Sequence, residues 1–187
     1  MSGWDLPRSV TVCGRPYPVC SDYRDVLEVI AGLNDPDMPD SLRYRVALEL
    51  FYEDSYPDIP PEDLQEAAEQ MMWFINCGEA DTDPTPRPQL IDWEQDRLLI
   101  VADINKTAGT EVRALPYLHW WTFAAHFSAI GEGRLSAVVG IREKLRTGQT
   151  LDEWERKYLR ENPSVVQLKT RYTRAEEDLL NDLLGKG

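Results

Sequence analysis

The chain has 187 residues, of which 42% are apolar, and its 33 acidic residues against 20 Lys and Arg give a formal net charge of −13. This length suffices for one domain with a hydrophobic core. The negative charge makes nucleic acid and membranes poor candidate partners. No apolar run reaches the roughly 20 residues that span a bilayer and the N-terminus lacks a secretory signal, so we expect a soluble intracellular protein.

The N-terminal part predicts a small hairpin followed by a helix. Residues 10–19 contain two short β-prone runs with Gly14 and Arg15 between them, and the prolines of the second run suit an edge strand. Asp22 is a candidate N-cap for a helix that runs to about Leu33.

Apolar residues at helical spacing predict seven further helices. They cover about residues 40–52, 60–78, 92–109, 115–130, 135–145, 150–162 and 173–184. Asp92 is expected to cap the third of these, and Thr150 with Glu153 fits a capping box for the sixth. The predicted fold class is mainly α, a compact bundle of about seven or eight short helices with a small N-terminal β-hairpin.

The proline-rich segment 80–89 is the only credible linker in the chain. We expect residues 1–162 to form a single helical domain that contains this segment as an internal loop. Residues 163–187 form a C-terminal tail, which is either a peripheral helix or disordered, because its leucines make only a narrow apolar stripe.

The stretch from Leu115 to Ile130 holds two Trp, two Phe, one Tyr and both histidines. Pro116 suits a first helical turn, and apolar side chains cover most of the circumference of the predicted helix. Such a helix is either a core element or a docking surface. Leu118, Trp120 and Phe123 are expected in the core, which leaves Trp121 and Phe127 as candidate partner-binding residues.

A metal or catalytic site is not favoured. His119 and His126 share one helix face, and Cys77 or Glu94 could join them, but seven residues separate the two Cα atoms by about 10 Å along a helix. Motifs of nucleophilic or nucleotide chemistry are missing, and three cysteines without a CxxC pair favour reduced thiols. We expect no catalytic residue, no metal ligand and no cofactor.

Several short blocks in a fixed order resemble a family of bacteriophage tail proteins. The blocks are FINCG at Phe74–Gly78, IDWEQD at Ile91–Asp96, LHWWTF at Leu118–Phe123 and GIR at Gly140–Arg142. Together with the opening LPRSVTVCGRPYPVCSDYRDVL, they extend the resemblance over about Leu6 to Lys157. On these motifs the chain is similar to the tail assembly chaperones of siphophages that infect Gram-positive bacteria, although its connection NKTAGTEVRAL departs from the family's usual segment.

The resemblance implies a non-enzymatic chaperone that keeps the tape measure protein soluble and is later displaced by tail tube subunits. The implied partners are the tape measure protein, the tail tube protein and further copies of the chain. The implied location is the host cytoplasm during infection, with the protein absent from the mature virion. Leu179, Leu180 and Leu183 join Trp121 and Phe127 as candidate partner-binding residues.

Two alternatives remain open from the sequence. The first is a structural subunit of the tail or neck, which would stay in the finished particle. The second, from another class, is a metal-dependent enzyme that uses His119 and His126.

Overall fold

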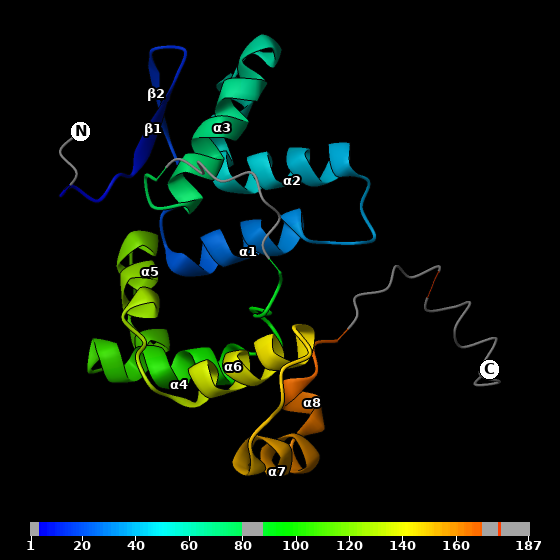
Figure 1. Ribbon diagram of the computed structural model, residues 1–187. Coiled ribbons are helices and arrows are strands. Elements are labelled where there is room, and N and C mark those ends of the chain that lie inside the picture. The colour runs from blue at the N-terminus through cyan, green and yellow to red at the C-terminus, as the bar shows by residue number, and fades with distance from the viewer. Residues whose placement is uncertain (1–3, 80–87, 170–175, 177–187) are drawn as a thin grey trace. The chain divides into compact units, whose positions relative to one another are not determined.

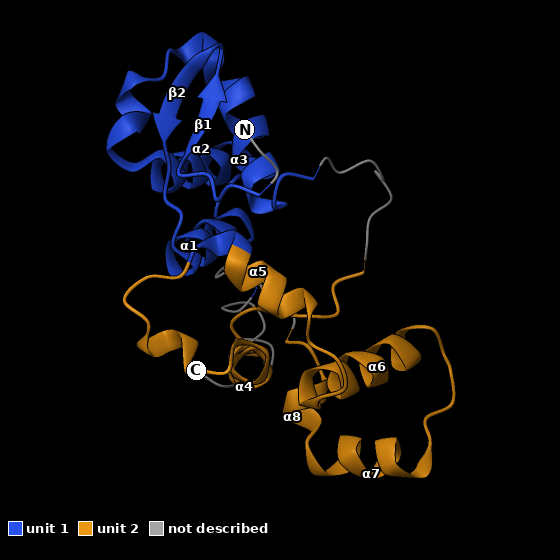
Figure 2. Ribbon diagram, turned by 90° about the vertical axis from the view of Figure 1, so that its left-hand side faces the viewer, with its two compact units in different colours: residues 1–82, 119–121, 170–187 blue, residues 83–118, 122–169 orange. Residues whose placement is uncertain are grey.

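The computed structural model describes residues 4–79, 88–169 and 176, and these residues form two compact units. Unit 1 contains residues 4–79 together with His119–Trp121, and unit 2 contains the rest of residues 88–169 (Figure 2). The division along the chain falls at residues 82 and 83, inside the proline-rich segment. The expectation that both units belong to one domain stays a prediction.

Within the described ranges, the mainly helical fold with an N-terminal hairpin is confirmed. In unit 1 the elements are β1 (Ser9–Val12), β2 (Arg15–Pro18), α1 (Tyr23–Leu33), α2 (Asp40–Tyr52), the 3-10 turns η1 (Glu53–Asp58) and η2 (Pro61–Asp63), and α3 (Leu64–Ile75). In unit 2 they are α4 (Arg97–Ala108), the 3-10 turn η3 (Val112–Ala114), α6 (Arg134–Arg146), α7 (Glu153–Glu161) and α8 (Pro163–Val166). Helix α5 (Trp120–Ser128) has its first two residues in unit 1 and the others in unit 2. None of the helices in this part of the chain is long and apolar enough to cross a membrane.

The hairpin turn lies one residue earlier than predicted. β1 and β2 pair antiparallel with Val12 opposite Arg15, so the two turn residues are Cys13 and Gly14. Both have positive φ values, 45° and 79°, as a type I′ turn requires. Arg15 therefore belongs to the second strand, and the hairpin packs beside α3 (Figure 1).

A hydrogen-bonded cluster, which we call the thiol clasp, ties the hairpin tip to α3. The Cys13 N–H donates to Glu66 Oε1 at 2.9 Å, and the Cys13 thiol lies 3.2 Å from Asp63 Oδ1 and 3.1 Å from Glu66 Oε2. Hydrogen bonds to the two carboxylates raise the pKa of Cys13 to about 12. The same contacts with Cys13 lower the pKa of Glu66.

Helices α1 and α2 run in opposite directions side by side (Figure 1). Asp22 caps α1 by accepting the Arg24 N–H, as predicted, and the bounds Asp40–Tyr52 of α2 are those expected from its apolar spacing. The core of unit 1 is built from fully buried side chains on these helices, the hairpin and α3. They include Val10, Val12, Val26, Val29, Phe51, Met71 and Phe74.

Three predicted helix starts in the second half of the chain were wrong. Asp92 accepts the N–H groups of Glu94 and Gln95 and so caps a turn, whereas α4 begins only at Arg97. The capping box of α7 consists of Asp152 and Glu155, because Asp152 accepts the Glu155 N–H and Glu155 accepts the Asp152 N–H. Thr150 and Glu153 have no part in it.

The third error concerns the aromatic stretch, where α5 starts at Trp120 and not near Pro116. The chain before α5 pairs with the segment before α1: His119 forms an antiparallel bridge with Asp22, and the Trp120 N–H donates to Ser21 O at 2.8 Å. This pairing holds the backbone extended up to His119. The helix predicted for residues 173–184 lies outside the described residues, apart from residue 176.

Candidate partner-binding surface

The FINCG block, Phe74–Gly78, forms the C-terminal end of α3 and the turn that follows it. The Cys77 N–H donates to Phe74 O at 3.0 Å and the Gly78 N–H donates to Trp73 O at 2.9 Å, which is the hydrogen-bond pattern of a Schellman motif. Cys77 and Gly78 both have positive φ values, 57° and 85°. A Cβ atom at Gly78 would lie 3.0 Å from Trp121 Cη2, so this position favours glycine for two independent reasons.

Two Trp side chains, which we call the indole clamp, satisfy the last carbonyl groups of α3. Trp120 Nε1 donates to Ile75 O at 2.8 Å, and Trp121 Nε1 donates to Phe74 O at 2.9 Å. A helix leaves its final carbonyl oxygens without intrahelical partners. The neighbouring Trp-Trp pair of the LHWWTF block therefore completes the helix that the FINCG block ends.

His119 supports the indole clamp through both ring nitrogens. Nδ1 accepts the Trp121 N–H at 3.0 Å, so the proton lies on Nε2, which donates to Pro7 O at 2.8 Å. Burial lowers the pKa of His119, and nearby Arg8 acts in the same direction, while the bond to Pro7 opposes them. A neutral, fully bonded ring that is only 3% exposed has a structural role.

In unit 2, a second set of contacts centres on a buried arginine, and we call it the Arg142 hub. The guanidinium of Arg142 meets the Asp96 carboxylate in a bidentate pair at 2.6 and 2.8 Å. Its other donors bond Leu90 O, Val165 O and Val166 O at 2.7 to 2.8 Å. The GIR and IDWEQD blocks thus meet in one site, because Arg142 and Asp96 come from them.

Asp103 provides a further buried carboxylate in unit 2 and positions the start of α6. Its Oδ2 accepts the Leu135 N–H at 3.0 Å, and its Oδ1 accepts from Lys106 Nζ. These hydrogen bonds lower the pKa of Asp103 although burial acts to raise it. Asp103 therefore links α4 to the start of α6.

The predicted partner-binding residues fall into two groups. Trp121 is half-buried and packs on Trp73 with ring centroids 5.6 Å apart, and Phe127 is half-buried against Trp93 at 5.0 Å. Leu179, Leu180 and Leu183 lie outside the described residues. A partner-binding role for all five stays a prediction, and Trp121 and Phe127 have structural contacts in addition.

The core predictions for the aromatic stretch are largely confirmed. Trp120 and Phe123 are buried, at 4% and 2% exposure, while Leu118 is half-buried. Within residues 4–79 and 88–169, His, Cys, Asp and Glu side chains form no group of three that could hold a metal ion. The expectation that the chain needs no metal stays a prediction.

Several large apolar side chains of the described residues lie at the surface. In unit 1 they include Leu42, Tyr44, Leu50 and Met72, and in unit 2 they include Leu98, Leu145 and Trp154. Leu98 on α4 is 69% exposed. Helical spacing shows that such residues share one face of a helix, but it does not show whether another element covers that face.

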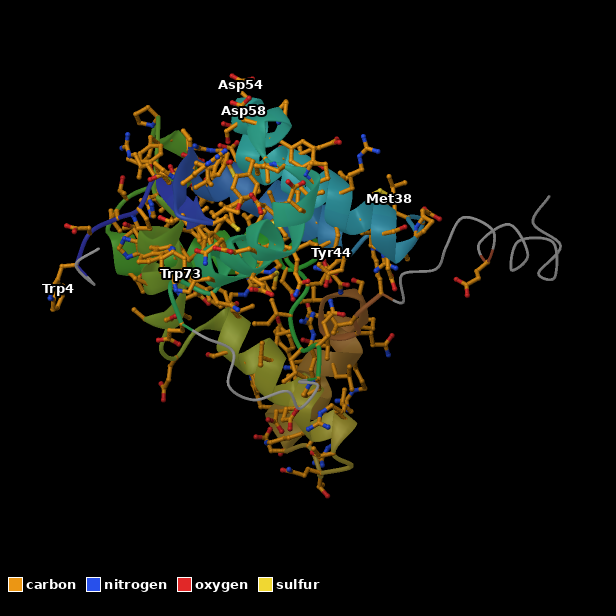
Figure 3. All side chains as sticks on the ribbon, turned by 90° about the horizontal axis from the view of Figure 1, so that it is seen from above. Trp4, Met38, Tyr44, Asp54, Asp58 and Trp73 are labelled. Carbon is orange, nitrogen blue, oxygen red and sulfur yellow. The ribbon has the colours of Figure 1, made fainter. Side chains whose placement is uncertain are left out.

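The negative charge is concentrated in unit 1. Residues 4–79 contain five Arg and 16 Asp and Glu, a net charge of −11, whereas residues 88–169 contain 11 basic and 11 acidic residues. Between residues 46 and 79 there are nine acidic residues and no Lys or Arg. Asp54 and Asp58, both on η1, belong to this acidic stretch (Figure 3).

A comparison with known protein families gives one match. The profile of a family described as Bacteriophage Gp15 protein matches residues 4–168, which include every block named above. The molecule is therefore a bacteriophage protein. The chain belongs to the Bacteriophage Gp15 protein family, which suggests a structural or assembly protein of the phage. No curated protein and no solved structure matches the chain.

Proposed function

We propose that this protein is a tail assembly chaperone that binds the tape measure protein, keeps it soluble, and is displaced when tail tube subunits assemble around it. In this proposal the protein is not an enzyme and needs no cofactor. It acts in the host cytoplasm during infection, associates with further copies of itself along the client, and is absent from the mature virion.

The observation that carries the proposal is the presence of large exposed apolar side chains on a strongly acidic protein. Leu42 and Leu50 are 44% and 39% exposed in a unit whose described residues 4–79 have a net charge of −11. Apolar side chains on helices suit the apolar faces of client helices. Net charge far from zero keeps complexes apart in solution, which a protein that solubilises an aggregation-prone client requires.

The dispersion of these apolar side chains supports displacement as well as binding. Single residues spread over several helices give many weak contacts rather than one tight, aromatic-rich interface. Such contacts are replaced one after another by tube subunits without a large barrier at any step. Family membership supports a role in phage structure or assembly and is compatible with this task.

The test is coexpression of the protein with the tape measure protein encoded by the same phage. We expect the two to copurify, and we expect the soluble fraction of the tape measure protein to increase severalfold over expression alone. If the two proteins neither copurify nor change each other's solubility, the proposal is wrong.

Mass spectrometry of purified virions separates a chaperone from a structural subunit. The proposal predicts that peptides of this protein are absent from washed particles, while tube and tape measure peptides are abundant. Stoichiometric amounts in the particle would show instead that the protein is a tail or neck component.

A further inference from the structure

Three consecutive residues of the aromatic stretch, His119–Trp121, belong to unit 1, while the residues directly before and after them belong to unit 2. We call these three residues the inserted segment. In the sequence, residues 80–118 separate the inserted segment from residues 4–79 of unit 1. Unit 1 is therefore completed by a short piece of chain that comes from a distant part of the sequence (Figure 2).

The inserted segment joins unit 1 first through its backbone. His119 forms an antiparallel bridge with Asp22, and the Trp120 N–H donates to Ser21 O at 2.8 Å. Addition of an extended segment to main-chain groups is a common way in which one chain takes up a piece of another. In that mode the main-chain bonds contribute affinity and the side chains contribute specificity.

The side chains of the inserted segment make this contact specific. His119 Nε2 donates to Pro7 O at 2.8 Å, and the indole clamp donates to the last carbonyl groups of α3. Gly78 leaves the space that Trp121 fills, since a Cβ atom there would lie 3.0 Å from Trp121 Cη2. We call the positions that take up the inserted segment the receptor site, and they are Pro7, Ser21, Phe74, Ile75 and Gly78.

The hydrogen bonds in the receptor site join neutral groups. The donors are two indoles, a main-chain N–H and the imidazole of His119, whose pKa is lowered by burial, and the acceptors are main-chain carbonyl oxygens. Residues 4–79 have a net charge of −11, so two copies of the chain repel one another where their acidic surfaces meet. The receptor site suits contact between copies, because these bonds form without pairing of charges.

The receptor site makes the same bonds whichever copy of the chain supplies the inserted segment. In the sequence, the proline-rich segment 80–89 lies between α3, which ends in the receptor site, and the inserted segment. Pro-rich linkers act as spacers between the parts that they connect. Exchange of an identical element between copies is a low-cost route to association, because the contacts are conserved.

We infer that copies of this chain associate by exchange of the inserted segment, so that His119–Trp121 of one copy occupy the receptor site of the next. This inference rests on the self-association in the proposed function and deepens it, because it names the contact. A copy that gives its inserted segment to one neighbour takes up the inserted segment of another. Such a head-to-tail contact forms open chains of copies when it does not close into a ring, and an open chain suits association along a client.

The experiment pairs a donor variant with a receptor variant of the full-length protein. The donor variant, Trp120→Ala with Trp121→Ala, lacks the indole clamp and keeps the receptor site. The receptor variant, Gly78→Val, places a branched side chain at φ +85° in the space of the Trp121 ring and keeps the inserted segment.

The two variants are coexpressed with different affinity tags. We expect them to copurify, because the inserted segment of the receptor variant fits the receptor site of the donor variant. Neither variant is expected to copurify with a differently tagged copy of itself. Two tagged wild-type copies copurify, and so do two tagged copies of Trp154→Ala, the matched control, because Trp154 lies on α7 and is 54% exposed.

A labelled peptide with the sequence of residues 115–130 measures the receptor site directly by fluorescence anisotropy. We expect it to bind the donor variant, and we expect a peptide with both Trp replaced by Ala to bind about tenfold or more weakly, because it lacks two hydrogen bonds. Trp121→Ala alone repeats the measurement with a smaller disturbance of unit 1, and circular dichroism shows that each variant is folded. Equal binding of the two peptides overturns the receptor site.

The outcomes separate this inference from the proposed function. If tagged wild-type copies copurify and the donor and receptor variants do not, the inference is wrong and self-association uses another surface. Failure of the wild-type copies to copurify also overturns it. The solubility of the tape measure protein in the presence of the wild type is measured separately, and that result alone decides the chaperone proposal.

Discussion

Side chains of unit 1 and unit 2 both donate hydrogen bonds to backbone carbonyl groups, but with different chemistry. The indole clamp uses two neutral N–H groups for Phe74 O and Ile75 O. The Arg142 hub uses one charged group for three carbonyls and therefore needs Asp96 as a buried counter-ion. Removing a neutral N–H donor costs only the hydrogen bond that it made. Removing one member of a buried ion pair also leaves the other charge buried without compensation.

This comparison predicts that the hub is the most sensitive point of the molecule. Arg142→Met leaves the Asp96 carboxylate, which is 1% exposed, without its charged partner, and we expect the free energy of unfolding to fall by about 3–5 kcal/mol. Denaturant unfolding followed by far-UV circular dichroism measures the loss. Arg146→Met, which removes only a surface pair with Glu143, is the control at below about 1 kcal/mol. Equal losses in the two variants would contradict the proposed importance of burial.

A smaller effect is expected within the indole clamp, and it differs between its members. Among the described residues, Trp120→Phe leaves Ile75 O with a contact to the Cys77 thiol at 4.0 Å, while Trp121→Phe leaves Phe74 O bonded to the Cys77 N–H at 3.0 Å. We expect losses of about 2 and about 1 kcal/mol in the free energy of unfolding, respectively. The reverse order would show that ring packing outweighs the hydrogen bonds.

Substitution of Gly78 measures how closely the Trp121 ring of the indole clamp packs on the end of α3. Gly78→Ala combines a φ of +85° with a Cβ atom 3.0 Å from Trp121, and we expect a loss of about 1–2 kcal/mol in thermal or denaturant unfolding. Gly109, at φ +67° with open space around a Cβ, is the matched control for the backbone term alone. If Gly109→Ala costs as much as Gly78→Ala, contact with Trp121 contributes nothing.

The smallest expected effect is the pH dependence from His119. Burial holds its pKa below the unfolded value of about 6.5, so the unfolded chain binds more protons below that pH. The contribution of neutral His119 is complete above the unfolded pKa and is lost as the pH falls toward and through the folded pKa. Unfolding measured between about pH 7.5 and 5.5 should show this decline, with a shallower slope in His119→Gln; His126, Asp25 and Glu53 are present in both proteins. Identical slopes would exclude His119 as the source.

Local signals in the sequence predicted much of the fold. Asp22 as an N-cap, the bounds of α2 and the end of α4 at Gly109 follow from interactions within a few residues, and the structure contains them. The start of α5 depends on pairing between His119 and Asp22, which are far apart in the chain. Helical periodicity has no access to such a contact, so Pro116 was wrongly given the role of a helix start.

The candidate surfaces were harder to predict than the helices. The motif blocks contain the residues of the indole clamp and the Arg142 hub. The sequence does not show, however, that Arg142 contacts Asp96 or that two indoles contact the end of α3. A single basic residue inside the apolar positions of α6 was the available signal for the hub. The exposure of Leu42 and Leu50 had no such signal, because spacing along a helix does not show which of its faces another element covers.

The thiol clasp has a consequence for the chemistry of Cys13, the exposed cysteine of the described residues. The thiolate is the form that reacts with oxidants and alkylating agents, and a pKa of about 12 leaves on the order of one part in 10⁵ ionised at neutral pH. Two carboxylates thus protect an accessible sulfur that burial does not cover. Cys13 is therefore expected to react slowly with alkylating agents at neutral pH, although its side chain is exposed.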